Sequence, residues 1–201
     1  MVTVTECTTL GKGRLRFHLD NGTELVLYRG EAKQFRMREG STLSDEEEHQ
    51  LIYEVVGKRA KRRTMHLLEQ MDRTEQQLRE KLKQGGYPQA CIDLALEYVK
   101  SFHYVDDYRY ACPYINYRQD RMSRYQLKVK LYGKGVSGEL VDRALEECYE
   151  GDEQDQIIRL LEKKKFDAQN SDPKEFTRVY QYLMRRGFRS NDVLRAMKSK
   201  Q

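Results

Sequence analysis

One pattern of apolar residues around a glycine occurs three times along the chain. The first copy consists of Leu78, Leu82, Gly86, Tyr87, Ile92 and Leu96. The second lies 49 residues further on and consists of Leu127, Leu131, Gly135, Val136, Val141 and Leu145. A further shift of 52 residues gives Val179, Leu183, Gly187, Phe188, Val193 and Met197. Such self-similarity is typical of repeat proteins, so we expect similar units in tandem.

Each copy predicts two helices joined by a turn. Apolar residues four positions apart lie on the same side of a helix. A glycine suits the left-handed position after a helix, and the next apolar residue then packs beneath the turn. Thr74, Ser123 and Asp172 precede the three copies as N-caps, the last of them followed by Pro173. Amphipathic segments at residues 60–71, 108–117 and 157–161 add one helix to each copy, so the sequence predicts three units of three helices.

The composition favours small helical units over one large globular core. Hydrophobic residues make up 38% of the chain, charged residues 34%, and the mean hydropathy is −0.89. A three-helix unit has little core of its own, so we expect neighbouring units to pack into an elongated or crescent arrangement. The acidic residues 146–155 and the polar residues 167–173 are expected to be linkers or helix junctions and to act as hinges.

The first 43 residues have a different pattern. Residues 2–28 alternate in the manner of strands, and Asp20-Asn21-Gly22 is a strong signal for a tight turn. This predicts a small β-meander or hairpin that docks on a helix, followed by a short helix at about residues 30–37. Ser44 and Glu47 then form a predicted capping box. The expected fold is therefore mainly α, with a β-rich extension at 1–43, a first repeat with its leading helix at 44–104, a central repeat at 105–152 and a third repeat at 153–201.

Basic and aromatic residues gather in the central repeat. From Tyr108 to Lys134 the chain carries seven basic residues and six tyrosines but a single acid, Asp120. Lysine and arginine neutralise phosphates and flat rings can stack on bases, so this composition indicates a surface for a polyanion. A solvated basic helix face whose tyrosines are half-buried in the core explains the same composition. The sequence leaves both interpretations open.

Helical spacing selects the candidate contact residues within this stretch and its counterpart in the third repeat. We expect Tyr110, Ala111, Tyr114 and Ile115 to belong to the core, and Tyr117, Tyr125 and Tyr132 to be exposed. The residues predicted to bind a partner or nucleic acid are Arg118, Arg121, Arg124, Tyr125, Lys128, Lys130, Tyr132, Arg185, Arg186 and Arg189. Residues 59–63 and 163–165 extend this into a discontinuous basic strip.

Motifs for catalysis or metal binding are missing from the sequence. The four cysteines (Cys7, Cys91, Cys112 and Cys148) form no C-x-x-C pair, and the histidines lack metal-ligand spacing. We interpret the cysteines as isolated thiols in a reducing compartment. Asp106 and Asp107 suit an N-cap and the first turn of a helix better than acid–base catalysis. We therefore expect a soluble cytoplasmic protein that is not an enzyme, has no cofactor and does not span a membrane.

Two segments resemble the signatures of a known family. The first is Tyr104-Val105-Asp106-Asp107-x-Arg109-Tyr110-Ala111, with Tyr114-Ile115-x-x-Arg118 and Leu127-x-x-x-Leu131-x-x-x-Gly135-Val136 after it. The second is Tyr182-Leu183-Met184-Arg185-Arg186-Gly187-Phe188. Together they are similar to the central and closing elements of the RecX family, which regulates the RecA recombinase, and the resemblance extends over residues 58–198. Two departures are Tyr110, where the family often has Phe, and the β-rich extension, which only some members have.

The resemblance implies tandem three-helix repeats that bind in the groove of the RecA filament on single-stranded DNA. It also implies inhibition of the ATPase and of strand exchange. Two alternatives remain open at this point. One is an autonomous nucleic-acid-binding protein with helix-turn-helix-like units, which would also bind duplex DNA. The other is a helical scaffold for an acidic partner. A monomer is the default expectation for the oligomeric state.

Overall fold

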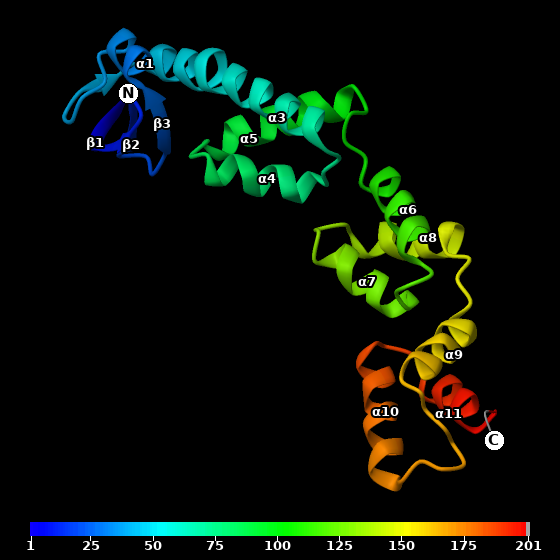
Figure 1. The fold of residues 1–201 in the computed structure, drawn as a ribbon. Coiled ribbons are helices and arrows are strands. Elements are labelled where there is room, and N and C mark those ends of the chain that lie inside the picture. Colours follow the sequence, from blue (N-terminus) through cyan, green and yellow to red (C-terminus); the bar gives the residue numbers. More distant parts are fainter. Residues whose placement is uncertain (200–201) are drawn as a thin grey trace. The chain divides into compact units, whose positions relative to one another are not determined.

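The N-terminal segment folds into a four-stranded antiparallel sheet. The computed structural model describes residues 1–199, and its strands are β1 (Val2–Gly11), β2 (Arg14–Leu19), β3 (Glu24–Tyr28) and β4 (Thr42–Leu43), in the order β3-β2-β1-β4 (Figure 1). Strands β2 and β3 pair with Phe17 opposite Leu25. The predicted turn at Asp20-Asn21-Gly22 joins them, with Gly22 at a φ of 82°. The expected β-rich extension is therefore confirmed.

One face of this sheet is buried beneath helices. Phe17, Leu25 and Leu27 are fully buried in one core with residues of α1 (Arg29–Gln34) and of the π-helix η1 (Gln50–Gly57). Helix α2 (Asp45–His49) directly precedes η1 in the sequence and begins with the predicted capping box. In that box the Glu47 N–H donates to Ser44 Oγ over 3.1 Å, and the Ser44 N–H donates to Glu47 Oε2 over 2.9 Å. Helix α1 ends earlier than the predicted residue 37, because Arg36 has a positive φ of 51°.

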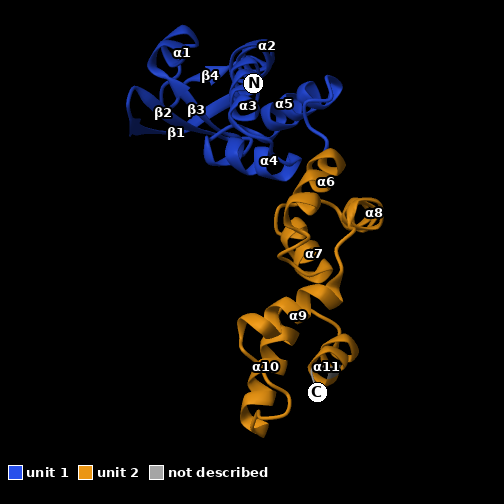
Figure 2. Ribbon diagram, turned by 45° about the vertical axis from the view of Figure 1, so that its right-hand side comes forward, with its two compact units in different colours: residues 1–106 blue, residues 107–201 orange. Residues whose placement is uncertain are grey.

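The first repeat continues from this core. It contains α3 (Lys58–Gln70), α4 (Glu75–Gln84) and α5 (Gln89–Ser101). Thr74 caps α4 by accepting the Gln77 N–H, and Gly86 follows α4 with a φ of 76°. Leu78, Leu82, Ile92 and Leu96 are buried in the same core as the sheet. Sheet and first three-helix domain together form a first unit, residues 1–106 (Figure 2).

The second unit begins at Asp107 and holds two further three-helix domains. The second domain consists of α6 (Asp107–Arg118), α7 (Arg124–Tyr132) and α8 (Gly138–Cys148). The third consists of α9 (Glu153–Lys163), α10 (Pro173–Arg185) and α11 (Ser190–Ser199). Each has its own apolar core, built from the repeated residues. The prediction of three units of three helices is confirmed, although the link expected at 146–155 shrinks to the few residues between α8 and α9.

The interpretation of all four cysteines as isolated thiols is wrong for one pair. Cys112 of α6 and Cys148 of α8 form a disulfide, with their Cα atoms 5.6 Å apart. The pairing follows from the packing of α6 against α8, and two cysteines 36 residues apart give no local signal of it. Cys7 and Cys91 are free thiols. Burial raises the pKa of Cys91 to about 12, so this thiol stays protonated and unreactive at neutral pH.

Candidate nucleic-acid and partner interface

The start of α7 is tied to the turn after α10. Ser123 caps α7 by accepting the Gln126 N–H over 3.2 Å, and its own hydroxyl donates to the Arg186 carbonyl over 2.5 Å. Ser123 is completely buried. The loop before it is held by α9, since Gln156 Nε2 donates to the Gln119 carbonyl over 2.6 Å. The second and third domains therefore meet at a defined junction.

A glycine allows close approach at this junction. Gly187 has a φ of 78°, and a Cβ atom placed there would lie 2.1 Å from Cδ1 of Tyr125. The Tyr125 ring thus packs directly on the backbone of the turn while 58% of the residue stays exposed. This contact places an exposed aromatic ring of α7 next to Arg186.

Two of the predicted cations lie on the side of α7 next to its buried leucines. Leu127 and Leu131 are buried, while Arg124 and Lys128 lie one turn apart beside them. Tyr132, 42% exposed, follows one turn after Lys128. We call Arg124, Tyr125, Lys128 and Arg186, with the flanking exposed Arg185 and Arg189, the junction face.

Two other candidates lie differently. Lys130 is exposed, but it follows Lys128 by two residues and so points roughly 200° away around the helix. Arg121 is exposed in the loop between α6 and α7. The structure therefore gathers most of the candidate residues near one junction and leaves Lys130 on another side of α7.

Several of the cations rest on tyrosine rings. The guanidinium carbon of Arg118 lies 4.1 Å from the centroid of the Tyr114 ring, and that of Arg186 lies 4.8 Å from the Tyr182 ring. Arg124 lies 5.8 Å from the ring of Tyr149. Such contacts fix a cation without neutralising it.

Carboxylates neutralise only part of the junction face. Lys128 forms an ion pair with Asp142, and this hydrogen bond raises the pKa of Lys128. Within residues 1–199 no carboxylate lies within ion-pair distance of Arg118, Arg124, Arg185, Arg186 or Arg189. The Arg124 backbone N–H, in contrast, donates to Glu153 over 2.8 Å, which places an acid at the start of α7. The arginines of the junction therefore keep their charge available for an anionic partner.

The expected exposure of the tyrosines agrees with the structure. Tyr117 is 76% exposed, and Tyr125 and Tyr132 are exposed as well. Ala111 and Ile115 are fully buried, as predicted for core positions. Tyr110 and Tyr114 are half-buried against that core, and Lys134 lies 5.3 Å from the centroid of the Tyr114 ring.

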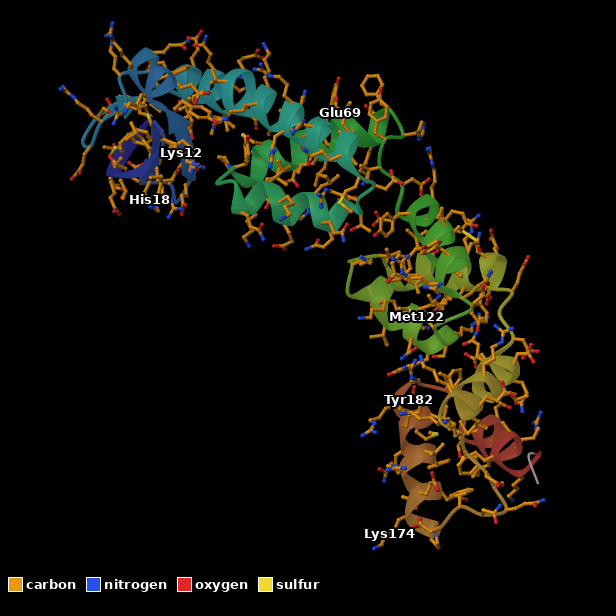
Figure 3. The ribbon with its side chains drawn as sticks, viewed as in Figure 1. Lys12, His18, Glu69, Met122, Lys174 and Tyr182 are labelled. Carbon is orange, nitrogen blue, oxygen red and sulfur yellow. A yellow bond between two sulfur atoms is a disulfide. The ribbon has the colours of Figure 1, made fainter. Side chains whose placement is uncertain are left out.

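Sequence reasoning missed the residues that build the junction. Ser123 was recognised as a cap, but its bond to the Arg186 carbonyl joins residues 63 positions apart. Tyr149 and Glu153 lie in the acidic stretch 146–155, whose sequence predicts only a linker or helix junction. The alignment of Gly187 with Gly86 was the available signal, because a positive φ often accompanies close packing. Figure 3 labels Met122, just before α7, and Tyr182 on α10, on the two domains that share this junction.

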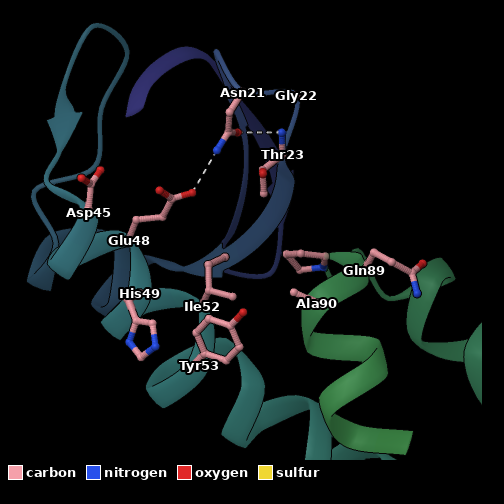
Figure 4. A pocket seen from close by; sticks show the side chains of 11 residues that line it. Asn21, Gly22, Thr23, Asp45, Glu48, His49, Ile52, Tyr53, Gln89 and Ala90 are labelled. Atoms are coloured by element: carbon pink, nitrogen blue, oxygen red, sulfur yellow. Dashed lines mark hydrogen bonds between the residues drawn. The ribbon is translucent and has the colours of Figure 1, made fainter. Parts of the chain in front are cut away.

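A separate pocket in the first unit has a different character. It has a volume of about 550 Å³ and lies between the β2–β3 turn, α2, η1 and the start of α5 (Figure 4). Asn21 Nδ2 donates to Glu48 over 2.9 Å at its rim, and Asp45 pairs with the N-terminal amine. Its charged side chains include Asp45 and Glu48, so a polyanion does not suit it.

The described part of the chain holds no metal-binding cluster. Residues 1–199 contain no group of three or more His, Cys, Asp or Glu side chains that is arranged to hold a metal ion. Nor does any helix among these residues have the length and apolarity to cross a membrane.

Comparison with known proteins gives consistent matches. Family models of the first and third three-helix domains of RecX match residues 60–98 and 151–197. The chain is 28% identical to the regulatory protein RecX of Caldanaerobacter subterraneus subsp. tengcongensis, over 80% of each chain. It is 32% identical to the regulatory protein RecX of Geobacillus kaustophilus over 77% of this chain, which spans 59% of that relative. A crystal structure of a regulatory protein RecX superposes with a TM-score of 0.64 at 20% identity, covering 96% of this chain and 97% of that one.

Proposed function

This chain belongs to the RecX family of regulatory proteins, and on that premise we propose that it binds the RecA filament on single-stranded DNA and inhibits its ATPase and strand exchange. It acts as a monomeric, cytoplasmic regulator without a cofactor or catalytic activity of its own. The partner surface is the junction face, extended by Arg118, Arg121 and Tyr132, and Lys130 makes a separate contact from another side of α7.

The uncompensated arginines of the junction carry this proposal. A filament of protein on single-stranded DNA offers backbone phosphates and acidic protein surface, and both attract cations that lack an internal counter-charge. Tyr125 adds an exposed ring beside Arg186, which suits stacking on a base or packing on a protein partner. Because Ser123 and Gly187 fix the geometry of this face, little conformational entropy is lost when it binds.

Three tandem domains allow several contacts with one polymer. Linked contacts raise the overall affinity through their effective concentration, so individually weak sites can hold a filament. A regulator bound in this way would hinder the conformational cycling of the protomers that it bridges, which accounts for inhibition without an active site.

The test is a titration of the single-stranded-DNA-dependent ATPase of the cognate RecA. We expect inhibition below one regulator per RecA protomer, and weaker inhibition by Arg118→Glu/Arg124→Glu after circular dichroism has confirmed its fold. Normal ATPase and filament length, together with tight DNA binding that weakens with salt, would contradict the proposal. That outcome would favour an autonomous nucleic-acid-binding protein, for which log K should fall with log salt at roughly 0.7 to 0.9 per neutralised phosphate.

A further inference from the structure

Three arginines and two tyrosines line another pocket of the first unit. Its volume is about 280 Å³, and it lies where the sheet meets the first three-helix domain. Arg14 and Tyr28 come from strands β2 and β3, Arg59 and Arg63 from α3, and Tyr87 from the turn after α4. No acidic side chain belongs to its lining.

The pocket is formed by docking the sheet on a glycine turn. Arg14 and Tyr28 are opposite each other in the β2–β3 ladder. The Val26 N–H on β3 donates to the Gly86 carbonyl over 3.2 Å, and a Cβ atom at Gly86 would lie 2.4 Å from Val26 Cγ2. This close contact fixes the edge strand of the sheet against the first domain, and Arg14 comes to share a pocket with α3.

Arg59 is held rigidly in this pocket. Its guanidinium forms an ion pair with Glu31 over 2.5 Å and also donates to the Val26 carbonyl. The guanidinium carbon lies 5.1 Å from the centroid of the Tyr28 ring and 5.5 Å from that of Tyr87. Only 18% of the Arg59 side chain is exposed. Arg59 is therefore a preorganised cation whose charge Glu31 offsets.

The other two arginines bring charge that is not offset. Arg63 follows Arg59 by one helical turn and so lies on the same side of α3. In the part of the chain that the structure describes, neither Arg14 nor Arg63 has a carboxylate within ion-pair distance. Burial raises the pKa of Tyr87, so its phenol keeps its proton and can donate a hydrogen bond. The pocket thus presents two arginines without an ion-pair partner among residues 1–199 and a phenol donor, while Glu31 offsets the charge of Arg59 alone.

We propose that this pocket binds the dianion of a phosphate monoester, with Arg14 and Arg63 as its ligands and Arg59 as a fixed cation beside them. Planar guanidinium groups match pairs of phosphate oxygens. The volume suits a phosphoryl group with a small substituent, because pockets for drug-sized ligands begin at about 300 Å³. The phosphoryl group comes either from a small phosphorylated molecule or from the 5′ end of a nucleic acid. This site lies in the first unit and is independent of the junction face.

Calorimetric titration of the full chain with inorganic phosphate, at constant ionic strength, tests the site. We expect Arg63→Gln and Arg14→Gln each to weaken phosphate binding about tenfold or more, because each removes a charge-assisted hydrogen bond. Arg62→Gln is the matched control, since Arg62 is the exposed neighbour on α3 outside this lining. Binding that is absent in the parent protein, or that Arg62→Gln weakens equally, would overturn the proposal. Circular dichroism checks the fold of each variant, and phosphate-induced NMR shifts of the Gly85 and Gly86 amides in the parent give a second readout.

A second titration distinguishes the two sources of the phosphoryl group. A short single-stranded oligonucleotide with a 5′-phosphate is compared with the same oligonucleotide ending in a 5′-hydroxyl. Tighter binding of the phosphorylated form, lost in Arg63→Gln, identifies a nucleic-acid end as the ligand. Equal binding of both oligonucleotides, with phosphate binding still dependent on Arg63, identifies a small phosphorylated molecule.

Discussion

At Gly187 the backbone and a neighbouring ring both exclude a side chain. The φ of 78° is unfavourable for any residue with a Cβ atom, and the Tyr125 ring occupies the place where that atom would stand. We predict that Gly187→Ala lowers the free energy of unfolding by about 1–3 kcal/mol, because it adds backbone strain and a clash at the junction. Urea unfolding of the full chain, followed by circular dichroism, measures the change.

Gly133→Ala is the control for this prediction. Gly133 ends α7 with a φ of −64°, and a Cβ atom there would meet its nearest neighbour at 3.5 Å, an ordinary contact. Alanine should therefore leave stability unchanged or raise it by about 0.4–1 kcal/mol. The clash component at Gly187 should shrink when Tyr125→Ala is added. Equal effects of the two glycine substitutions would show that the junction does not depend on close approach at Gly187.

At the scale of helices, the disulfide joins α6 to α8 across the core of the second domain. Closing a loop of 36 residues stabilises a fold by about 3–4 kcal/mol in the chain-entropy description. We predict that a reductant lowers the free energy of unfolding of the air-oxidised protein by this amount. The same reductant should have no effect on Cys112→Ser/Cys148→Ser.

Thiol titration of the unfolded, unreduced chain checks the pairing directly. It should find two thiols, those of Cys7 and Cys91. The variant Cys7→Ser should keep the full sensitivity to reductant, since Cys7 takes no part in the disulfide. Four titratable thiols in the oxidised preparation would contradict the pairing.

Helices were more predictable than the contacts between them. The apolar spacing and the glycine of each repeat depend on local rules, so the three helix–turn–helix copies and the caps at Thr74, Ser123 and Asp172 followed from the sequence. The pairing of Cys112 with Cys148 and the bond from Ser123 to Arg186 did not, because they depend on how helices pack. The π-helical stretch at Gln50–Gly57 was also missed, since its apolar residues suit an ordinary helix equally well.

At the same scale, the basic residues were predictable as a group but not as a surface. Spacing along α7 placed Arg124 and Lys128 on one side of the helix, as expected for residues four apart. The spacing does not predict that Asp142 of α8 neutralises Lys128, or that the turn containing Arg186 packs against Tyr125. Which cations keep their charge is a property of packed neighbours, and this choice decides the proposed interface.

For the whole molecule, the local distribution of charge is more informative than the total. A net charge of +5 over 201 residues is modest, yet the junction face and the Arg14–Arg59–Arg63 pocket each concentrate cations without enough acid to balance them. The two sites lie in different units, so we expect substitutions in one to leave binding at the other unchanged.

The most direct test of this account is the affinity of the protein for RecA assembled on single-stranded DNA, measured for two charge-matched variants. Arg124→Glu/Arg186→Glu reverses two cations of the junction face, whereas Lys174→Glu/Lys198→Glu makes the same change in net charge at two exposed lysines of the third domain, one at the start of α10 and one near the end of α11. We predict that the first variant weakens filament binding at least tenfold, about 1.4 kcal/mol or more, and that the second stays within about threefold of the parent. Equal weakening by both variants would contradict a specific role of the junction face and leave net charge as the cause of binding.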